Sequence, residues 1–200
     1  MPTKNIVKSF DAPAYYHVYN RASGERHLFR DAADREYFIH LMRRHLLPPK
    51  DGADEIYRIY DVKVVAYCLM SSHFHLLLYQ EIDAGAITGL MRSVGTAYSM
   101  YYNRKYKSKG HVFQSAFRAS YIADEAYLSH ISRYIHLNPR NYATWKWSSY
   151  KNYVSKRYDE WVEPLYTLGM SAEQYENFVI DYARVDQRKH YTQLKDILAA

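Results

Sequence analysis

Two apolar segments separated by a short break constrain the fold more than any other feature of this 200-residue sequence. The first, Tyr57 to Met70, is rich in Ile, Val and Tyr, and the second runs from His73 to Tyr79. Both have the composition of β-strands, and the Met70-Ser71-Ser72 break is short enough for a tight connection. The sequence therefore predicts two adjacent, tightly connected strands in the middle of the chain.

The remaining elements follow from periodicity and composition. We expect a strand at 15–20, helices at 34–47 and 86–102, a strand at 117–122 and a third helix from 124 to about 138. Pro139 ends that helix, because proline disfavours helical geometry in the residue before it. The order strand, helix, strand, strand, helix, strand predicts an α+β, ferredoxin-like split βαβ fold, with both crossover helices on one face of an antiparallel sheet.

The domain organisation is expected to be one main domain followed by an extension. No Pro-, Gly- or Ser-rich stretch divides the first 150 residues, so residues 1–150 are predicted to form a single unit. Beyond it, Ser171 to Gln174 fits a capping box, and Tyr175, Phe178 and Val179 begin an apolar stripe. Residues 151–200 are therefore predicted to be a C-terminal helical extension.

Composition indicates the kind of partner. Lys and Arg number 27 against 21 Asp and Glu, for a formal charge of +6, and there are 23 tyrosines. Cations favour polyanions, and tyrosine rings offer faces on which unpaired bases stack. The single cysteine, Cys68, suits a reducing compartment, and the sequence has neither an export signal nor a long apolar run. We expect a cytoplasmic protein that does not contact a membrane.

His73 and His75 are the first candidate functional residues. Side chains alternate along a strand, so both imidazoles share the face that the crossover helices leave open, and neutral imidazoles side by side can bind a divalent metal. The third helix has an apolar stripe, and Tyr134 and Asn138 lie four residues apart on one flank of it. If that helix packs on the open face, Tyr134 approaches the metal and Asn138 can be a third ligand. Spacing alone is more typical of two surface histidines and a packing tyrosine than of a metal site.

Five segments together resemble a known family over roughly residues 14 to 152. They occur in the family's order and are Tyr16 to Arg21, Ala66 to Leu77, Gly110 to Arg118, Arg133 to Pro139 and Trp147 to Tyr150. The chain resembles the single-tyrosine HUH transposases, and more closely the REP-associated tyrosine transposases.

The resemblance implies a metal-dependent transposase that cleaves and transfers single-stranded DNA at a hairpin. Tyr134 would be the nucleophile and form a 5′-phosphotyrosine, while His73, His75 and Asn138 would bind Mg²⁺ or Mn²⁺. Relatives act as monomers or homodimers. One departure is Ser71-Ser72, where relatives commonly have Pro-Asn, and a missing Asn would weaken contacts near the metal or the substrate.

DNA contacts are predicted in a basic segment and in one motif. The candidates are Arg104, Lys105, Lys107, Lys109, Gln114 and Arg118. A cationic loop suits phosphates, although it equally fits a solvated surface loop. Two alternatives to the transposase remain open at this point: a non-catalytic binder of single-stranded nucleic acid on the same fold, and a metal hydrolase that uses activated water.

Overall fold

The computed structural model describes residues 9–49, 57–124, 126–155, 159–164 and 169–184. The elements are β1 (Ala14–Arg21), α1 (Ala32–Leu46), β2 (Val62–Leu69), β3 (His73–Gln80), α2 (Ala86–Lys105), β4 (Arg118–Ile122), α3 (Ala126–His136), α4 (Tyr150–Val154) and α5 (Ala172–Arg184). The first six elements follow the predicted order of a split βαβ unit, which confirms the predicted fold class.

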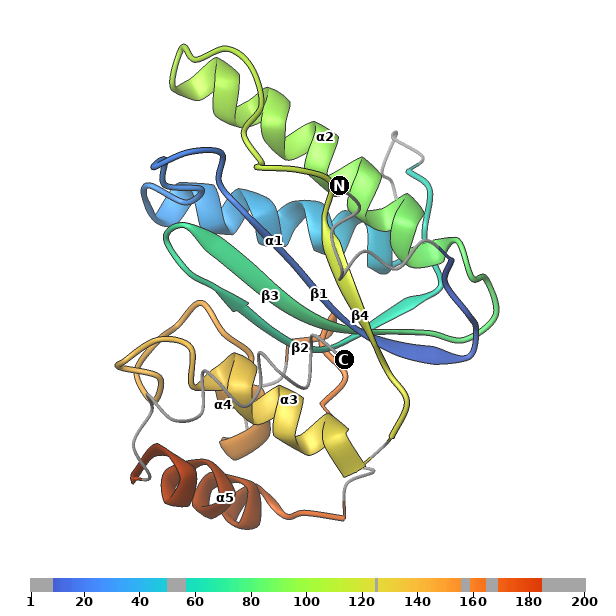
Figure 1. Cartoon of the computed structure of the whole chain (residues 1–200), viewed down its shortest axis with the longest axis vertical. Coiled ribbons are helices and arrows are strands. Elements are labelled where there is room, and N and C mark those ends of the chain that lie inside the picture. Colours follow the sequence, from blue (N-terminus) through green and yellow to red (C-terminus); the bar gives the residue numbers. More distant parts are fainter. Residues whose placement is uncertain (1–8, 50–56, 125, 156–158, 165–168, 185–200) are drawn as a thin grey trace.

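The sheet has the strand order β2-β3-β1-β4, and each neighbouring pair is antiparallel. Helices α1 and α2 cover one face, whereas α3, α4 and α5 lie on the other side (Figure 1). The face that the crossover helices leave open is therefore covered by α3, as the sequence predicted.

Alternation along β3 explains how one strand serves both faces. Phe74, Leu76 and Leu78 are buried in the core formed with α1 and α2, whereas Leu77 belongs to a separate cluster on the opposite face. The α3 residues in that second cluster are Leu128, Ile131 and Ile135. The apolar stripe predicted for the third helix thus docks it on the histidine-bearing face of the sheet.

Hydrogen-bonded caps fix the start of two helices. The Asp31 side chain accepts from the backbone N–H of Asp34, and the Asp34 side chain accepts from the backbone N–H of Asp31, so α1 begins before the predicted Asp34. At α5, the backbone N–H of Gln174 donates to Ser171 Oγ, and that of Ser171 donates to Gln174 Oε1. The predicted capping box at Ser171 is therefore confirmed.

The structure corrects several boundaries. Helix α2 continues to Lys105, so Arg104 and Lys105 are helical and not part of a loop. Both residues favour helices, and the chain leaves the helix only near Lys107, which has a positive φ of 49°. Residues 57–61 run outside β2, and β4 begins at Arg118 rather than at Phe117. These ends depend on pairing partners that local composition does not reveal.

The described part of the predicted extension contains two helices, whereas its residues 159–164 are not helical and Val162 forms an isolated parallel bridge with Val64. Helix α4 begins one residue before the predicted boundary at 151, and α5 follows it. The segments 156–158, 165–168 and 185–200 lie outside the described residues. In the portion of the chain that the structure covers, no helix is long and apolar enough to span a membrane.

Candidate active site

Strand register determines which side chains share the face covered by α3. Tyr19 of β1 lies opposite His75 of β3 and also opposite Arg118 of β4, while Arg21 lies opposite His73. Directly opposed residues of antiparallel strands project from the same face. One row across the sheet therefore holds His75, Tyr19 and Arg118, and the next row holds His73 and Arg21.

His73 contacts the predicted third ligand. Its Nε2 lies 3.0 Å from Oδ1 of Asn138, and its Nδ1 lies 3.0 Å from Oγ of Ser72. Burial lowers the pKa of His73, the hydrogen bond with Asn138 opposes that shift, and the charge of Arg21 lowers the pKa further. The structure thus brings His73 of β3 and Asn138, which follows α3, together. The hydroxyl of Ser72 contacts the other ring nitrogen of His73.

His75 is more deeply buried, with 7% of its surface exposed. Its Nδ1 lies 2.9 Å from Nε2 of His17, and the two rings stack with an interplanar angle of 17°. Burial, and then the proximity of His17 and His73, hold the pKa of His75 well below its usual range, and burial lowers the pKa of His17 to about 4. The three imidazoles are therefore neutral near pH 7, and neutral rings have the lone pairs that bind metals.

Tyr134 reaches this cluster from α3 of the same chain. Its ring centroid lies 5.5 Å from that of His75 and 6.0 Å from that of His17, and it meets both rings edge to face. The side chain is partly buried against the apolar cluster beneath α3. The predicted nucleophile and the predicted metal ligands His73, His75 and Asn138 thus occupy one site.

Helix α3 is fixed from outside by α5. The guanidinium of Arg133, next to Tyr134, lies 3.9 Å from the ring centroid of Phe178 and 3.6 Å from that of Tyr182. Its Nη1 also donates to the carbonyl of Phe178 at 3.3 Å. Cation–π contacts of this kind are strongest where the cation is desolvated, and Arg133 is 8% exposed. The extension therefore stabilises the position of the helix that carries Tyr134.

A buried hydrogen-bond network joins α3 to both α5 and the sheet. His136 Nδ1 lies 2.8 Å from the hydroxyl of Tyr175, which also lies 2.9 Å from Ser132 Oγ. On its other side, His136 Nε2 lies 2.8 Å from Ser149 Oγ, and that oxygen accepts from the backbone N–H of Tyr67 in β2. With both ring nitrogens paired, His136 connects α5 and β2 to the helix of the site.

Four of the six predicted DNA-contacting residues separate into two groups. Arg118 lies on the face of His73 and His75. Arg104, Lys107 and Lys109 are exposed at the far end of α2, on the opposite side of the sheet (Figure 1). The structure does not bring these three to the histidines.

Lys105 is engaged by carboxylates. Its Nζ lies 2.8 Å from Asp31 and 2.7 Å from Asp34, so its charge is compensated within the fold. A phosphate would have to compete with both carboxylates for this ammonium group. Lys105 is accordingly a link between α1 and α2.

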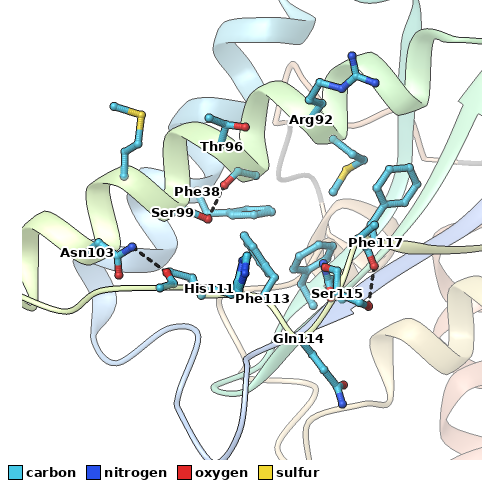
Figure 2. A pocket seen from close by; sticks show the side chains of 18 of the residues that line it. Phe38, Arg92, Thr96, Ser99, Asn103, His111, Phe113, Gln114, Ser115 and Phe117 are labelled. Carbon is cyan, nitrogen blue, oxygen red and sulfur yellow. Dashed lines mark hydrogen bonds between the residues drawn. The ribbon is translucent and has the colours of Figure 1, made fainter.

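Gln114 lies beside a cleft of about 840 Å³ that the sequence did not indicate. The cleft is formed by α2 and the segment 110–117, and it includes Phe38, Phe74 and Phe113 (Figure 2). The side chain of Gln114 points away from the other lining residues in this view. The cleft lies on the α1 and α2 side of the sheet, so it is separate from the histidine cluster.

Three residues of the site were missed at the level of sequence: His17, Arg21 and Ser72. His17, Tyr19 and Arg21 are every second residue of β1, so their side chains share one face of the sheet. Alternation within β1 does not predict which residues of β3 lie opposite His17 and Arg21. The pairing depends on the register between β1 and β3, and His17 and His75 are 58 positions apart in the sequence. Ser72 was noted only as a departure from the pattern of relatives, yet its hydroxyl contacts His73.

Comparison with known proteins identifies the fold and the family of the chain. A solved structure described as a REP-associated tyrosine transposase bound to a REP hairpin aligns with a TM-score of 0.56 at 13% identity, covering 80% of this chain and 96% of that one. The chain therefore shares the fold of that protein. The family model for IS200-like transposases matches residues 13–138, and the chain belongs to this family. No curated protein matches the chain significantly.

Proposed function

We propose that the chain cleaves and rejoins single-stranded DNA through a covalent bond to Tyr134. The observation that carries this proposal is the placement of the Tyr134 ring against His75 and His17, within the same chain. Tyr134 packs at the border of the apolar cluster beneath α3, and the edge contacts of its ring with His75 and His17 place it where that cluster meets the histidines. DNA is the proposed substrate because the chain is an IS200-like transposase.

The residues of the site fit a divalent cation. Neighbouring ligands of an octahedral Mg²⁺ ion stand about 3.0 Å apart when each metal bond is about 2.1 Å, and His73 Nε2 and Asn138 Oδ1 are separated by 3.0 Å. Among the described residues, no group of three or more His, Cys, Asp and Glu side chains could hold a metal, so the set depends on the carboxamide of Asn138. His73, His75 and Asn138 would hold Mg²⁺ or Mn²⁺, which would polarise the scissile phosphate.

The chemical step is a transesterification. The phenolic oxygen of Tyr134 attacks the phosphorus, the bond from phosphorus to the 3′ oxygen breaks, and the 3′ oxygen takes up a proton as it leaves. A phosphotyrosine at the 5′ end of the downstream strand results, together with a free 3′-hydroxyl. Attack by a second 3′-hydroxyl reverses the step and joins new ends, so no external energy source is required. Because a phenol has a pKa of about 10, the site must assist removal of its proton.

The cations of the site would contact the DNA backbone. Arg21 lies beside His73, and Arg118 lies in the row of His75, so both flank the proposed metal. Guanidinium groups bind phosphate oxygens in a bidentate manner. The exposed residues Arg104, Lys107 and Lys109 could contact only a part of the substrate that passes to the α2 side, such as a hairpin stem. The structural neighbour is described as bound to a REP hairpin, and hairpin DNA is the proposed partner here.

The experiment compares wild type with Tyr134→Phe on 5′- and 3′-labelled oligonucleotides that contain a hairpin, with Mg²⁺ or Mn²⁺. Wild type should give a covalent protein–DNA band on denaturing gels. Tyr134→Phe should bind the same DNA and give no such band, while Tyr127→Phe, on the exposed side of α3, should behave as wild type.

The outcomes separate the alternatives. Cleavage that persists in Tyr134→Phe without an adduct would indicate a hydrolase that uses activated water. Binding without metal-dependent cleavage by wild type would indicate a non-catalytic nucleic-acid-binding protein. An adduct formed by Tyr134→Phe would show that a different residue is the nucleophile.

A further inference from the structure

His17 is a buried polar residue of the site with no role in the proposed ligand set. Its side chain is 1% exposed, lies 2.9 Å from His75 and stacks on it. It also stacks on Tyr19, at a centroid distance of 5.2 Å. A buried imidazole held on two sides by rings has a fixed orientation, so its contact with His75 is a defined feature of the fold.

The contact determines which nitrogen of His75 can bind a metal. Because Nδ1 of His75 faces His17, Nε2 is the nitrogen left for coordination. A neutral imidazole that binds a metal through Nε2 carries its proton on Nδ1. In that state His75 Nδ1 donates, His17 Nε2 accepts, and the proton of His17 resides on its own Nδ1.

We propose that His17 is a positioning residue for the metal site: it accepts the hydrogen bond from Nδ1 of His75 and holds that ring in the tautomer and orientation that present Nε2 to the metal. This inference rests on the proposed function, since it requires a metal at His75. Ser72 provides the corresponding contact for the other ligand, with its Oγ 3.0 Å from Nδ1 of His73. Outer partners of this kind fix ligand geometry in metal sites generally.

The tautomer of His17 is expected to change on metal binding. Its Nδ1 is buried and has no hydrogen-bond partner among the described residues. Without metal, the less costly tautomer leaves that atom unprotonated, with Nε2 of His17 donating to His75. Coordination at His75 reverses the direction of the hydrogen bond without a change in the number of protons. The two states differ in which nitrogen of each ring carries a proton, and that difference is measurable.

The first experiment is NMR of the unmodified full chain labelled with ¹⁵N-histidine, with and without saturating Mg²⁺. Long-range proton–nitrogen spectra distinguish protonated from unprotonated ring nitrogens. With Mg²⁺ bound, Nε2 of His17 should be unprotonated and Nδ1 of His75 protonated. If Nε2 of His17 keeps its proton in the Mg²⁺-bound protein, the inference is overturned.

The second experiment measures the dissociation constant for Mn²⁺ by electron paramagnetic resonance. His17→Phe should weaken binding by about 10- to 100-fold, the usual effect of losing an outer partner. His17→Gln should recover part of that loss, because a carboxamide oxygen can accept from Nδ1 of His75. The control is His45→Gln, since His45 is a buried histidine of α1 whose Nδ1 contacts the carbonyl of Arg58, and its affinity should match wild type.

These outcomes separate the inference from the proposed function. If wild type does not bind Mn²⁺, the metal site of the proposed function is wrong, and the role of His17 falls with it. If wild type binds Mn²⁺ and His17→Phe binds it equally well, only the role of His17 is overturned. Should His17→Phe fail to fold, the NMR measurement on the unmodified chain still tests whether His17 accepts the hydrogen bond from Nδ1 of His75.

Discussion

Asn138 is the residue on which the proposed metal site depends most. It supplies the oxygen ligand, and it holds His73 at 3.0 Å in the structure. Replacement by alanine removes that oxygen and leaves two imidazoles, which favour softer metals than Mg²⁺. We expect Asn138→Ala to raise the dissociation constant for Mn²⁺ at least about tenfold.

The measurement is an Mn²⁺ titration, with Asn103→Ala as the control. Asn103 is an asparagine at the end of α2 whose amide donates to the carbonyl of Gly110, far from the histidines. Its variant should bind Mn²⁺ as wild type does. An unchanged affinity in Asn138→Ala would remove this residue from the ligand set.

The sequence predicted the placement of a side chain correctly where that placement depends only on neighbouring positions in the chain. The alternation that placed His73 and His75 on one face, opposite Phe74, requires only the geometry of a strand, and the structure bears it out. Lys105 shows the limit. Its positive charge was visible, but the carboxylates that compensate it belong to a helix cap more than 70 residues earlier in the chain.

Among the helices, α5 stabilises the position of α3 through buried hydrogen bonds. The hydroxyl of Tyr175 joins Ser132 and His136, both of which are fully or nearly fully buried. Tyr175→Phe keeps the ring but leaves two buried polar groups each short of a partner. Leaving such groups unsatisfied costs about 1–3 kcal/mol, so the free energy of unfolding should fall by about that amount.

Chemical denaturation measures this change, and Tyr127→Phe serves as the matched control. Tyr127 lies on α3 with 43% of its surface exposed, and loss of its hydroxyl should change the free energy of unfolding by no more than about 0.5 kcal/mol. Equal stabilities of the two variants would show that α5 does not hold α3 through this network.

The elements themselves were mostly predictable, and their ends and partners were not. Apolar periodicity gave the helix–strand order and the docking stripe of α3 because both depend on spacing along the chain. Register between β1 and β3 depends on contacts that only form in the folded chain, so the pairing of Arg21 with His73 was hidden. The helical identity of Arg104 was missed for a related reason, since nothing nearby marked the end of α2 clearly.

For the whole molecule, buried histidines make stability depend on pH. Burial lowers the pKa of His17 to about 4 and that of His136 to about 3, whereas an exposed histidine has a pKa of about 6.5. Below pH 6.5 the unfolded chain therefore binds protons that the folded chain does not, and stability is lost as the pH falls. Each group contributes a slope of up to roughly 1.4 kcal/mol per pH unit.

Urea denaturation at several pH values between 7.5 and 4, with a chelator present, measures this dependence. The free energy of unfolding should be nearly constant above pH 7 and should decline steadily from pH 6.5 toward 4. His17→Gln, if folded, should show a shallower decline. A stability that is flat across this range would contradict the burial of neutral histidines at the site.

In the proposed function, the phenol of Tyr134 and a metal held by His73 and His75 act on the same phosphate. The most direct test of this function is mass spectrometry of the covalent adduct formed with a hairpin oligonucleotide, after nuclease trimming and proteolysis. If Tyr134 is the nucleophile, the peptide that contains Tyr134 should carry a nucleotide-derived mass. A modification on any other of the 23 tyrosines would contradict that role of Tyr134.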